Sequence, residues 1–240
     1  SHIRRITVMN TNLEPIKYIK KERPIRGNIF ITKNESILCC GAIYMDNENK
    51  RIELLNSDGK LIRCFFNQTQ FGRYNPQKDY IQWAVDQWTS KMITGYSKNK
   101  SEIIISFEYP VNPVKFFVYD LNGKLVKIFS YNADKKYQFP NFLKSFPLKY
   151  PQKKVYYLTL SSLFIYKNYY LVFINYYMAN KGRGEIEKNK YLVFDHQGKL
   201  LAEKELKQHL KFFNLTYDGY LIGINPDDEI PKAVIYNLLF

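Results

Sequence analysis

The sequence predicts an all-β protein, a β-propeller of four-stranded antiparallel blades, and three observations carry this prediction. A hairpin signature, [DN]-x-x-G-K-L, recurs at Asn56, Asp120 and Asp195. Each copy follows a segment that is apolar almost throughout. Aromatic residues make up 17% of the 240 residues, and flat rings pack well on pleated sheets.

The first residue and the glycine of the signature have different roles. An Asn or Asp side chain can accept a hydrogen bond from a backbone N–H two residues further on. A glycine three positions later, such as Gly123, supplies the positive φ of a type I turn with a G1 bulge. We therefore expect Asn56, Asp120 and Asp195 to be turn formers rather than metal ligands.

The strands before these turns read RIELLN, KFFVYD and KYLVFD, and KAVIYN stands near the end of the chain. A sheet with one wet face would alternate apolar and polar residues, so continuous apolarity predicts sheets that are covered on both faces. Two more strands are expected before each, which makes the repeating unit a four-stranded meander. These further strands are expected at 28–32, 36–45, 92–96, 102–108, 155–160, 169–178, 212–216 and 220–224.

The repeat length matches that of propeller blades. The turn glycines step by 64 residues from Gly59 to Gly123 and by 75 from Gly123 to Gly198, and four strands per repeat are typical of a blade. The chain resembles the TolB-like and NHL-like superfamily of β-propellers, whose outer hairpins often read Y-D-x-x-G-K-L, as Tyr119–Leu125 does here. The resemblance covers most of the chain from about Gly27 onward and implies a propeller, more often one of six blades.

We expect a single propeller domain over residues 1–240, in which four blades are recognised. A fifth is counted if the N-terminal hairpin, with Asn10 opening the turn and Leu13 in place of glycine, forms its own partial sheet. A truncated six-bladed ring is the other alternative. The last blade stops at IYNLLF, where its fourth strand should begin. Since propellers commonly close by adding an N-terminal strand to the last blade, we expect that closure here.

Charge and composition narrow the choice of partner only slightly. The formal net charge is +14, from 36 basic and 22 acidic side chains, which permits association with nucleic acid, an anionic glycan or an acidic surface. No apolar run has the roughly 18 to 20 residues of a membrane helix. Three cysteines are too few for a disulfide framework and are expected to be buried thiols.

Two long insertions, 67–91 and 131–154, interrupt the meanders, and loops of this length are uncommon unless they have a function. The first holds both tryptophans. Its candidate ligand-binding residues, whose spacing would suit one side of a short helix, are Tyr80, Trp83, Asp86 and Trp88. They predict an aromatic platform for a sugar ring or a peptide. The alternative is a plug helix or extra strand whose tryptophans fill the core.

The second insertion interleaves aromatic and basic residues. Its candidate ligand-binding residues are Tyr137, Phe142, Lys135, Lys136, Lys144, Lys153 and Lys154. Cations beside flat rings suit an anionic partner with stackable parts. The alternative, favoured by Pro140, Pro147 and Pro151, is an extended loop whose aromatics pin it to the blades. A smaller basic segment, NKGRGEIEKNK at 180–190, is interpreted as a hairpin tip.

No catalytic residue and no metal ligand can be assigned from the sequence. His196 is expected to be solvated within a turn, and with His209 it makes too few ligands for a histidine-rich metal centre. Scattered carboxylates at a channel mouth remain an enzymatic alternative, in which calcium would be the cofactor. Those carboxylates are Asp46, Asp86, Glu108 and Asp227.

Three functional hypotheses follow. The leading one is a non-catalytic binding module that presents an aromatic and basic face to a protein or glycan partner outside the cytoplasm. The second is an extracytoplasmic hydrolase or lyase with a carboxylate or calcium site. The third is a module that binds an anion, either nucleic acid or an acidic glycan. The sequence contains no segment that we expect to span a membrane.

Overall fold

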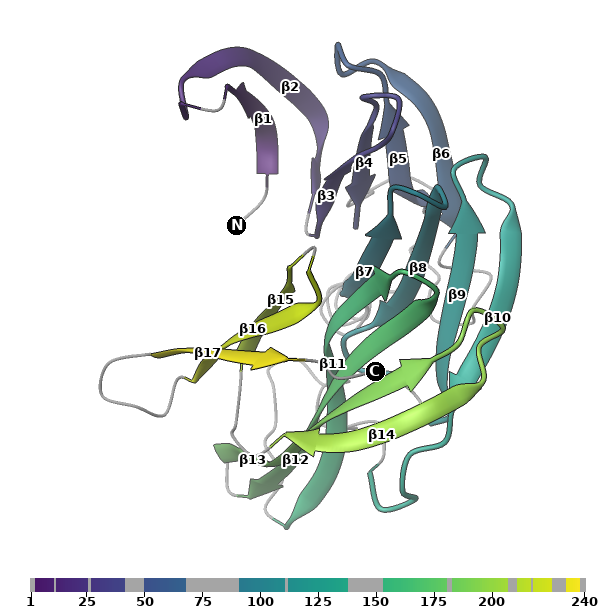
Figure 1. Cartoon of the computed structure of the whole chain (residues 1–240), viewed down its shortest axis with the longest axis vertical. Coiled ribbons are helices and arrows are strands. Elements are labelled where there is room, and N and C mark those ends of the chain that lie inside the picture. The colour runs from purple at the N-terminus through teal and green to yellow at the C-terminus, as the bar shows by residue number, and fades with distance from the viewer. Residues whose placement is uncertain are drawn as a thin grey trace.

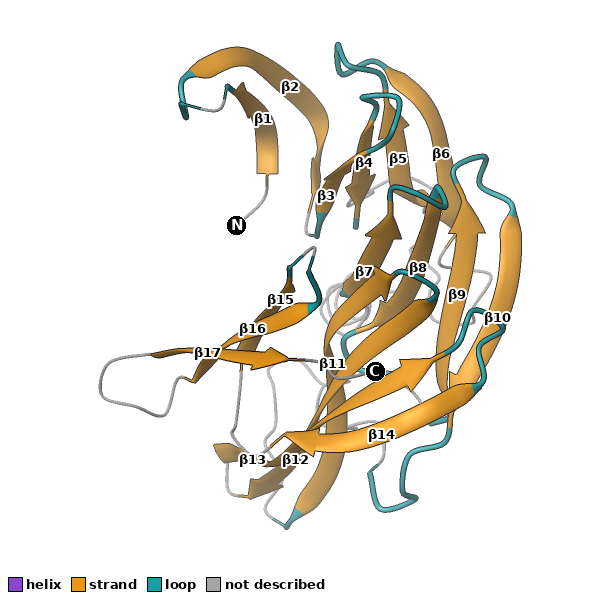
Figure 2. Cartoon of the chain, in the orientation of Figure 1, coloured by secondary structure: helices purple, strands orange, loops and turns teal. Residues whose placement is uncertain are grey.

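The structure, a computed structural model, describes residues 3–10, 12–25, 27–41, 50–67, 91–110, 112–137, 153–180, 183–206, 211–216, 218–225 and 232–237. In these residues the chain forms seventeen strands and no helix (Figure 2). The strands make five antiparallel sheets that follow one another along the chain.

The first sheet, the N-terminal hairpin, contains β1 (Ile3–Met9) and β2 (Pro15–Ile25). Blade one contains β3 (Ile29–Ile31), β4 (Ile37–Cys40), β5 (Lys50–Leu55) and β6 (Leu61–Asn67). Blade two contains β7 (Met92–Ser97), β8 (Glu102–Phe107), β9 (Val114–Asp120) and β10 (Leu125–Tyr131). Blade three contains β11 (Val155–Tyr166), β12 (Tyr169–Asn180), β13 (Arg183–Phe194) and β14 (Leu200–Leu206). Blade four contains β15 (Lys211–Leu215), β16 (Tyr220–Asn225) and β17 (Lys232–Asn237).

The sheets stand side by side in an open ring (Figure 1). In each blade the strands pair in sequence order, with the first strand innermost and the last one outermost. The predicted all-β propeller of antiparallel blades is therefore confirmed. Three blades have four strands, and blade four has three in the described part of the chain. The N-terminal hairpin forms a sheet of its own, as the five-sheet alternative expected.

The expected closure by an N-terminal strand is wrong for the strands described here. β17 pairs with β16 and β1 pairs with β2, and the opening of the ring lies between this hairpin and blade four (Figure 1). The physical reason is that the hairpin buries its apolar side against blade one. Ile19 is 3% exposed there, in a cluster with Ile37 and Leu55.

The repeated turns have the predicted geometry. At Asp120 the Gly123 N–H donates to the Asp120 carbonyl (3.1 Å), and the Lys124 N–H donates to Asp120 Oδ1 (2.9 Å). Gly123 has φ +77°, and a register shift beside the turn marks the bulge. The N-terminal hairpin makes the same pair of turn bonds at Asn10, with Leu13 at φ +65° in the glycine position.

Each turn glycine also sits against the outer strand of the preceding sheet. A Cβ on Gly123 would lie 2.8 Å from the Cβ of Phe65, and one on Gly198 would lie 2.6 Å from the Cβ of Phe129. Real Cβ atoms essentially never approach so closely. Glycine is thus required for two reasons: the backbone has a positive φ, and the preceding strand leaves no room for a Cβ atom. Gly59 meets Ile19 of the N-terminal hairpin in the same way, so β2 occupies the place of a preceding fourth strand.

A cation of the same outer strand reaches the next turn. Arg63 Nη1 donates to the Asn122 carbonyl (2.7 Å), and Lys17 Nζ donates to the Ser57 carbonyl (3.2 Å). Lys127 Nζ donates to the His196 carbonyl. We call this contact, together with the ring under the glycine, the blade clamp. It recurs at three junctions, from the N-terminal hairpin to blade three, with Ile19 in place of a ring at the first of them, and it fixes the spacing of these neighbouring sheets.

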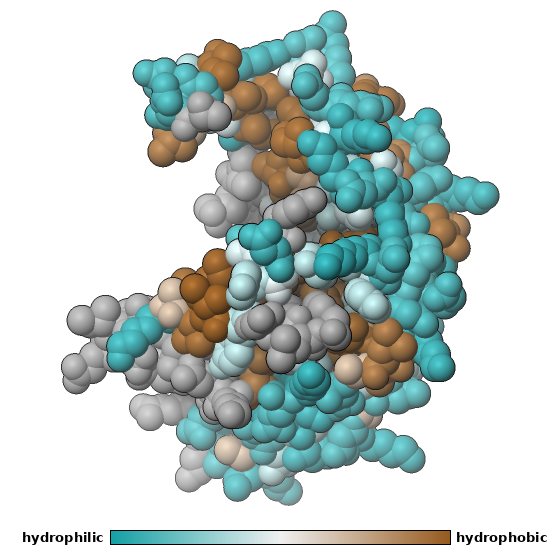
Figure 3. Space-filling model, viewed as in Figure 1, coloured by the Kyte–Doolittle hydropathy of each residue, from teal (hydrophilic) through white to brown (hydrophobic). Residues whose placement is uncertain are grey.

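The core lies between the blades, as the apolar strands predict. The middle strands β8, β9, β12 and β13 are mostly buried. Between blades two and three, Phe129 stacks on Phe116 and Tyr170, with ring centroids 5.0 and 5.2 Å apart. Hydrophilic residues predominate on the outer side of the ring (Figure 3), where the outer strands still expose apolar side chains such as Ile62, Ile128 and Leu201. Hydrophobic residues also face the opening of the ring near β2 and blade four (Figure 3). Cys39 and Cys40 are buried and form no disulfide, as expected, whereas Cys64 is only partly buried.

Candidate functional site

The two ends of the propeller carry different residues. At one end, the turn end, strands one and two and strands three and four of each blade are joined by tight turns. At the other, the connection end, each fourth strand finishes and the first strand of the next blade begins. Both predicted insertions start from the connection end.

Many of the predicted site residues lie outside the described residues. These are Tyr80, Trp83, Asp86, Trp88, Phe142 and Lys144, together with the carboxylates Asp46 and Asp227. The structure places the other predicted residues at the connection end, beside the start of β11. They are Lys135, Lys136, Tyr137, Lys153 and Lys154.

Tyr137 is the centre of an aromatic cluster on blade three. Its ring meets Tyr176 edge to face, with centroids 4.5 Å apart, and Tyr156 at 6.2 Å. Only 1% of Tyr137 is exposed. The segment after β10 is therefore anchored to the next blade by this ring, which is the role that the pinned-loop alternative gave to the aromatics.

Two lysines and one carboxylate surround these rings. Lys136 Nζ lies 4.7 Å from the ring centroid of Tyr137, and Lys188 Nζ lies 5.1 Å from that of Tyr176. Cations at this distance are attracted to the ring face. The Tyr137 hydroxyl donates to Glu187 Oε2 (2.8 Å), and Lys136 Nζ lies 3.7 Å from the same oxygen. We call these residues with Tyr156 the connection-end cluster.

Buried tyrosines continue beneath this cluster. The hydroxyls of Tyr131 and Tyr176 are 3.1 Å apart, and Lys190 pairs with Glu203 beside them. Burial raises the pKa of Tyr176 and, to a smaller extent, that of Tyr137. Both phenols therefore stay protonated at neutral pH and act as hydrogen-bond donors rather than as nucleophiles.

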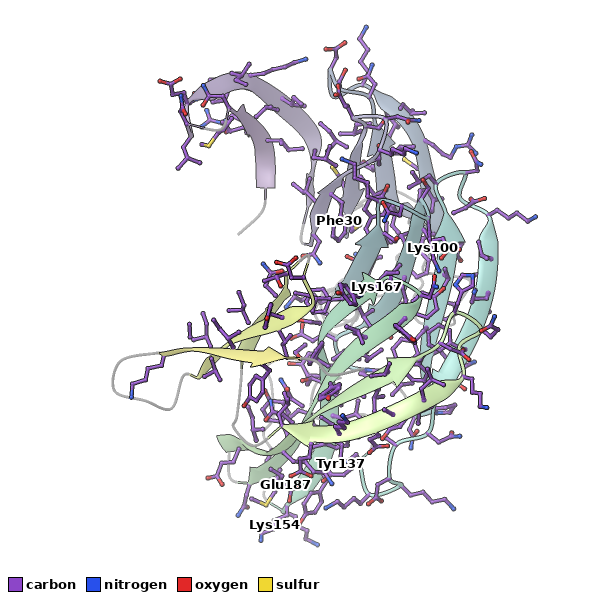
Figure 4. All side chains as sticks on the ribbon, viewed as in Figure 1. Phe30, Lys100, Tyr137, Lys154, Lys167 and Glu187 are labelled. Carbon is purple, nitrogen blue, oxygen red and sulfur yellow. The ribbon has the colours of Figure 1, made fainter. Side chains whose placement is uncertain are left out.

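The lysines around the cluster are accessible. Lys135, Lys136, Lys153 and Lys154 are all exposed, and Figure 4 shows Lys154 close to Tyr137 and Glu187 at this end of blade three. Asp134 is committed to the local turn, because its Oδ1 accepts the Lys136 backbone N–H (3.0 Å). The chemistry offered to a partner is thus a set of cations held on a rigid aromatic base.

A second candidate site is the central cavity of the ring, with a volume of about 960 Å³. It is lined by residues of the first strands β3, β7, β11 and β15. Three lysines line it, Lys91, Lys98 and Lys167, and none of the described lining residues is acidic. Lys91 pairs with Glu108, at 3.0 Å between Nζ and Oε2. In Figure 4, Phe30 and Lys167 border the central hollow.

Sequence reasoning missed several cluster members. Tyr156, Tyr176, Glu187 and Lys188 come from three different strands, so their spacing in the sequence does not bring them together. The interpretation of 180–190 as a hairpin tip was wrong for most of that segment, because β13 begins at Arg183. The alternating exposure from Glu185 to Lys188 is typical of a strand, and the run GEIEK carries that signal.

Within the described ranges, no three His, Cys, Asp or Glu side chains gather as metal ligands would. The same part of the chain contains no helix with the length and apolarity to cross a membrane. His196 is half-buried rather than solvated, with Nδ1 at 3.2 Å from Lys100 Nζ.

Comparison with known proteins supports the fold. No protein-family model matches the chain, and no curated protein matches it. A protein of unknown function from Bacteroides caccae superposes with a TM-score of 0.52 at 12% identity, over 98% of this chain and 66% of that one. This chain therefore spans less than two thirds of that protein, and at this identity the likeness concerns the fold alone.

Two more distant structures have TM-scores below 0.5. A DUF4221 family member from Bacteroides vulgatus gives 0.41 at 13% identity, over 98% of this chain and 89% of that one. BamB from Moraxella catarrhalis gives 0.33 at 9% identity, over 99% of this chain and 78% of that one.

Proposed function

We propose that this propeller is a non-catalytic binding module that presents its basic and aromatic connection end to an acidic protein or glycan partner. The observation that carries the proposal is the connection-end cluster, where Lys136 lies over the buried ring of Tyr137, together with the exposed Lys135, Lys153 and Lys154 beside it. An extracytoplasmic location belongs to the same proposal, together with the TolB-like character of the hairpins.

The geometry favours recognition over chemistry. Burial raises the pKa of Tyr137 and Tyr176, so both stay protonated. Glu187 already accepts a hydrogen bond from Tyr137 (2.8 Å) and lies 3.7 Å from Lys136 Nζ. Of the four carboxylates that an enzymatic site would use, Glu108 is described, and it pairs with Lys91. A rigid base also suits binding, because less conformational entropy is lost when a partner meets side chains that are already held.

A second candidate, an anion-binding module for nucleic acid or an acidic glycan, is favoured by the same lysines. It differs in that affinity would follow phosphate or sulfate charge and fall steeply with salt. Both candidates include an acidic glycan, and they differ in the other ligand class, an acidic protein for the first and nucleic acid for the second.

The experiment compares two triple variants of equal charge. In the first, Lys135, Lys153 and Lys154 are changed to Ser at the connection end. In the matched control, Lys60, Lys124 and Lys199, which are exposed in the turn-end hairpins, are changed to Ser. Retention is measured on heparin and on immobilised poly-glutamate as a function of salt.

The proposal predicts earlier elution of the first variant, by about a threefold lower salt concentration, with the control close to wild type. Preference for poly-glutamate indicates an acidic protein, and preference for heparin an acidic glycan. Equal loss in the two variants would mean that retention follows net charge alone, and the connection end would not be the binding face.

A further inference from the structure

The central cavity has the features of a ligand site that the connection end does not share. Its volume of about 960 Å³ lies within the range of small-molecule pockets. It is framed by the first strands of all four blades. The inference below does not depend on the proposed partner of the connection end.

The walls of the cavity offer backbone hydrogen-bonding groups. β3, β7, β11 and β15 are edge strands of their sheets. An edge strand leaves a row of backbone N–H and C=O groups without a ladder partner. Both donors and acceptors therefore face the axis of the ring, which suits a ligand with several hydroxyl groups.

Side chains add further polar groups to the same wall. The cavity is lined by Asn28, Thr94, Ser97 and Ser162, among others. Asn28 Nδ2 donates to the Thr94 carbonyl (3.0 Å), which leaves the Asn28 side-chain oxygen available as an acceptor. Tyr96 also lines the cavity, but its hydroxyl is buried beside the backbone of Lys33 and the side chain of Ser101, which lie outside the lining.

Two lysines at the turn end give the cavity its charge. Lys98 follows β7, and Lys167 occupies the tight turn between β11 and β12. Neither forms an ion pair within the described part of the chain. Lys167 is held at φ +51°, and its Nζ lies 5.1 Å from the centroid of the Tyr166 ring. Two unpaired cations beside a polar cavity favour an anion at this mouth.

We propose that the central cavity binds a small hydroxyl-bearing organic anion, such as a sugar acid or a sugar phosphate. Lys98 and Lys167 hold the carboxylate or phosphate at the turn end. The edge strands and the polar side chains bind the hydroxyl groups deeper in the channel. Lys91 contributes less, because Glu108 already neutralises it.

The test uses glucuronate, glucose 6-phosphate and glucose as probes in isothermal titration at low ionic strength. Glucose is a neutral relative of both anions, so it isolates the contribution of the charge. We expect at least one anion to bind about tenfold or more tightly than glucose, since hydrogen bonds to charged groups are the stronger ones. Preference for glucuronate identifies a carboxylate ligand, and preference for glucose 6-phosphate a phosphate ligand.

The variant Lys98→Ala with Lys167→Asn removes both cations and should fold, because asparagine tolerates the positive φ at position 167. It should bind the preferred anion about tenfold more weakly. Lys60→Ala with Lys124→Ala removes equal charge from exposed turns outside the cavity lining and should bind like wild type. Thermal unfolding of each variant checks that it is folded.

Three results would overturn the proposal: no binding of either anion, glucose binding as tightly as the anions, or equal loss in the two double variants. Binding of an extended acidic peptide such as Glu-Ala-Glu-Ala-Glu, with neither sugar anion bound, would also overturn it in favour of strand addition to the inner edges. Heparin retention depends on different lysines, so failure here leaves the test of the connection end intact.

Discussion

Blades two and three share one design at the turn end and differ at the connection end. Their outer hairpins make the same hydrogen bonds at Asp120 and Asp195. The strands of blade two have six or seven residues, whereas β11, β12 and β13 have twelve each. The extra length of blade three carries Tyr156, Tyr176 and Glu187, on which the segment after β10 is anchored.

This comparison distinguishes the contacts that pack every blade on the next from the features that are found in blade three alone. The turn and the blade clamp recur because each sheet must pack on the next at a fixed distance. The long strands of blade three serve no such need, since blade two packs without them. We therefore expect the binding residues of this chain to lie where a blade departs from the repeat. The following predictions test the repeated contacts first and the features of blade three afterwards.

The largest effect is expected from Phe129→Ala, which breaks the junction of blades two and three. Phe129 is 8% exposed and packs on Phe116, Tyr170 and Phe194. Loss of a buried phenylalanine typically costs about 3 to 4 kcal/mol of unfolding free energy. Urea denaturation measures this loss, and Ile128→Ala, at an exposed neighbour, should change stability by less than about 0.5 kcal/mol. Similar values for the two variants would contradict the packing at this junction.

Gly198→Ala tests the same junction from the other side. The new Cβ would sit at φ +87° and 2.6 Å from the Cβ of Phe129, so we expect a loss of about 2 kcal/mol. Leu13→Gly is the reverse change at the corresponding turn, where the side chain is exposed at φ +65°. It should leave stability unchanged or raise it by about 0.5 kcal/mol, because the strain of a non-glycine residue is relieved. A harmless Gly198→Ala would show that the clamp can relax.

Tyr137→Phe tests the part that is specific to blade three. It removes the hydrogen bond to Glu187 (2.8 Å) but keeps the ring, and a bond of this kind contributes about 1 kcal/mol. The change should show locally, as faster trypsin cleavage after Lys135 and Lys136 with little change in global unfolding. Tyr137→Ala should accelerate cleavage further. If neither variant alters cleavage, the segment is held by something other than this ring.

The smallest effect concerns pH. Burial lowers the pKa of His196, and the neighbouring charges of Lys127 and Lys100 add to this, against Glu102 and Asp195. The folded chain then binds this proton less readily than the unfolded chain. Stability is complete above the unfolded pKa of about 6.5 and declines as the pH falls through the lower folded value.

Melting temperatures between pH 7.5 and 5.5 measure the effect of His196. The wild type should lose slightly more stability over this range than His196→Gln, in which the proton-binding group is gone and the carboxylates are unchanged. Parallel curves for the two proteins would show that His196 titrates alike in the folded and unfolded states.

Local patterns in the sequence predicted the turns well and the contacts between blades poorly. Asn10 and Leu13 were enough to place the N-terminal hairpin, because the turn depends on neighbouring residues. The second role of Gly123, space for Phe65, depends on how two sheets pack. The sequence nevertheless contains a pattern that marks the blade clamp. A cation stands four residues after the turn glycine and an apolar residue stands six residues after it, as Arg63 and Phe65 follow Gly59.

The candidate sites show the same limit. Lys136 and Tyr137 stand out in the sequence because they are adjacent in an unusual insertion. Their partner Glu187 lies in β13, and the glycines and charged residues of GRGEIEKNK led to the interpretation of this segment as a loop. Lys98 and Lys167 line the same cavity because two blades place their inner turns at one mouth, which no spacing along the chain reveals.

The positions of Lys98 and Lys167 on hairpin turns have an evolutionary consequence. Both side chains are exposed, and the sheets behind them are held by buried residues of the middle strands, so single substitutions there can change the charge of the channel mouth at little cost in stability. A ring of this type could acquire a new ligand while its architecture is inherited unchanged, which would allow sequences to diverge widely around one scaffold.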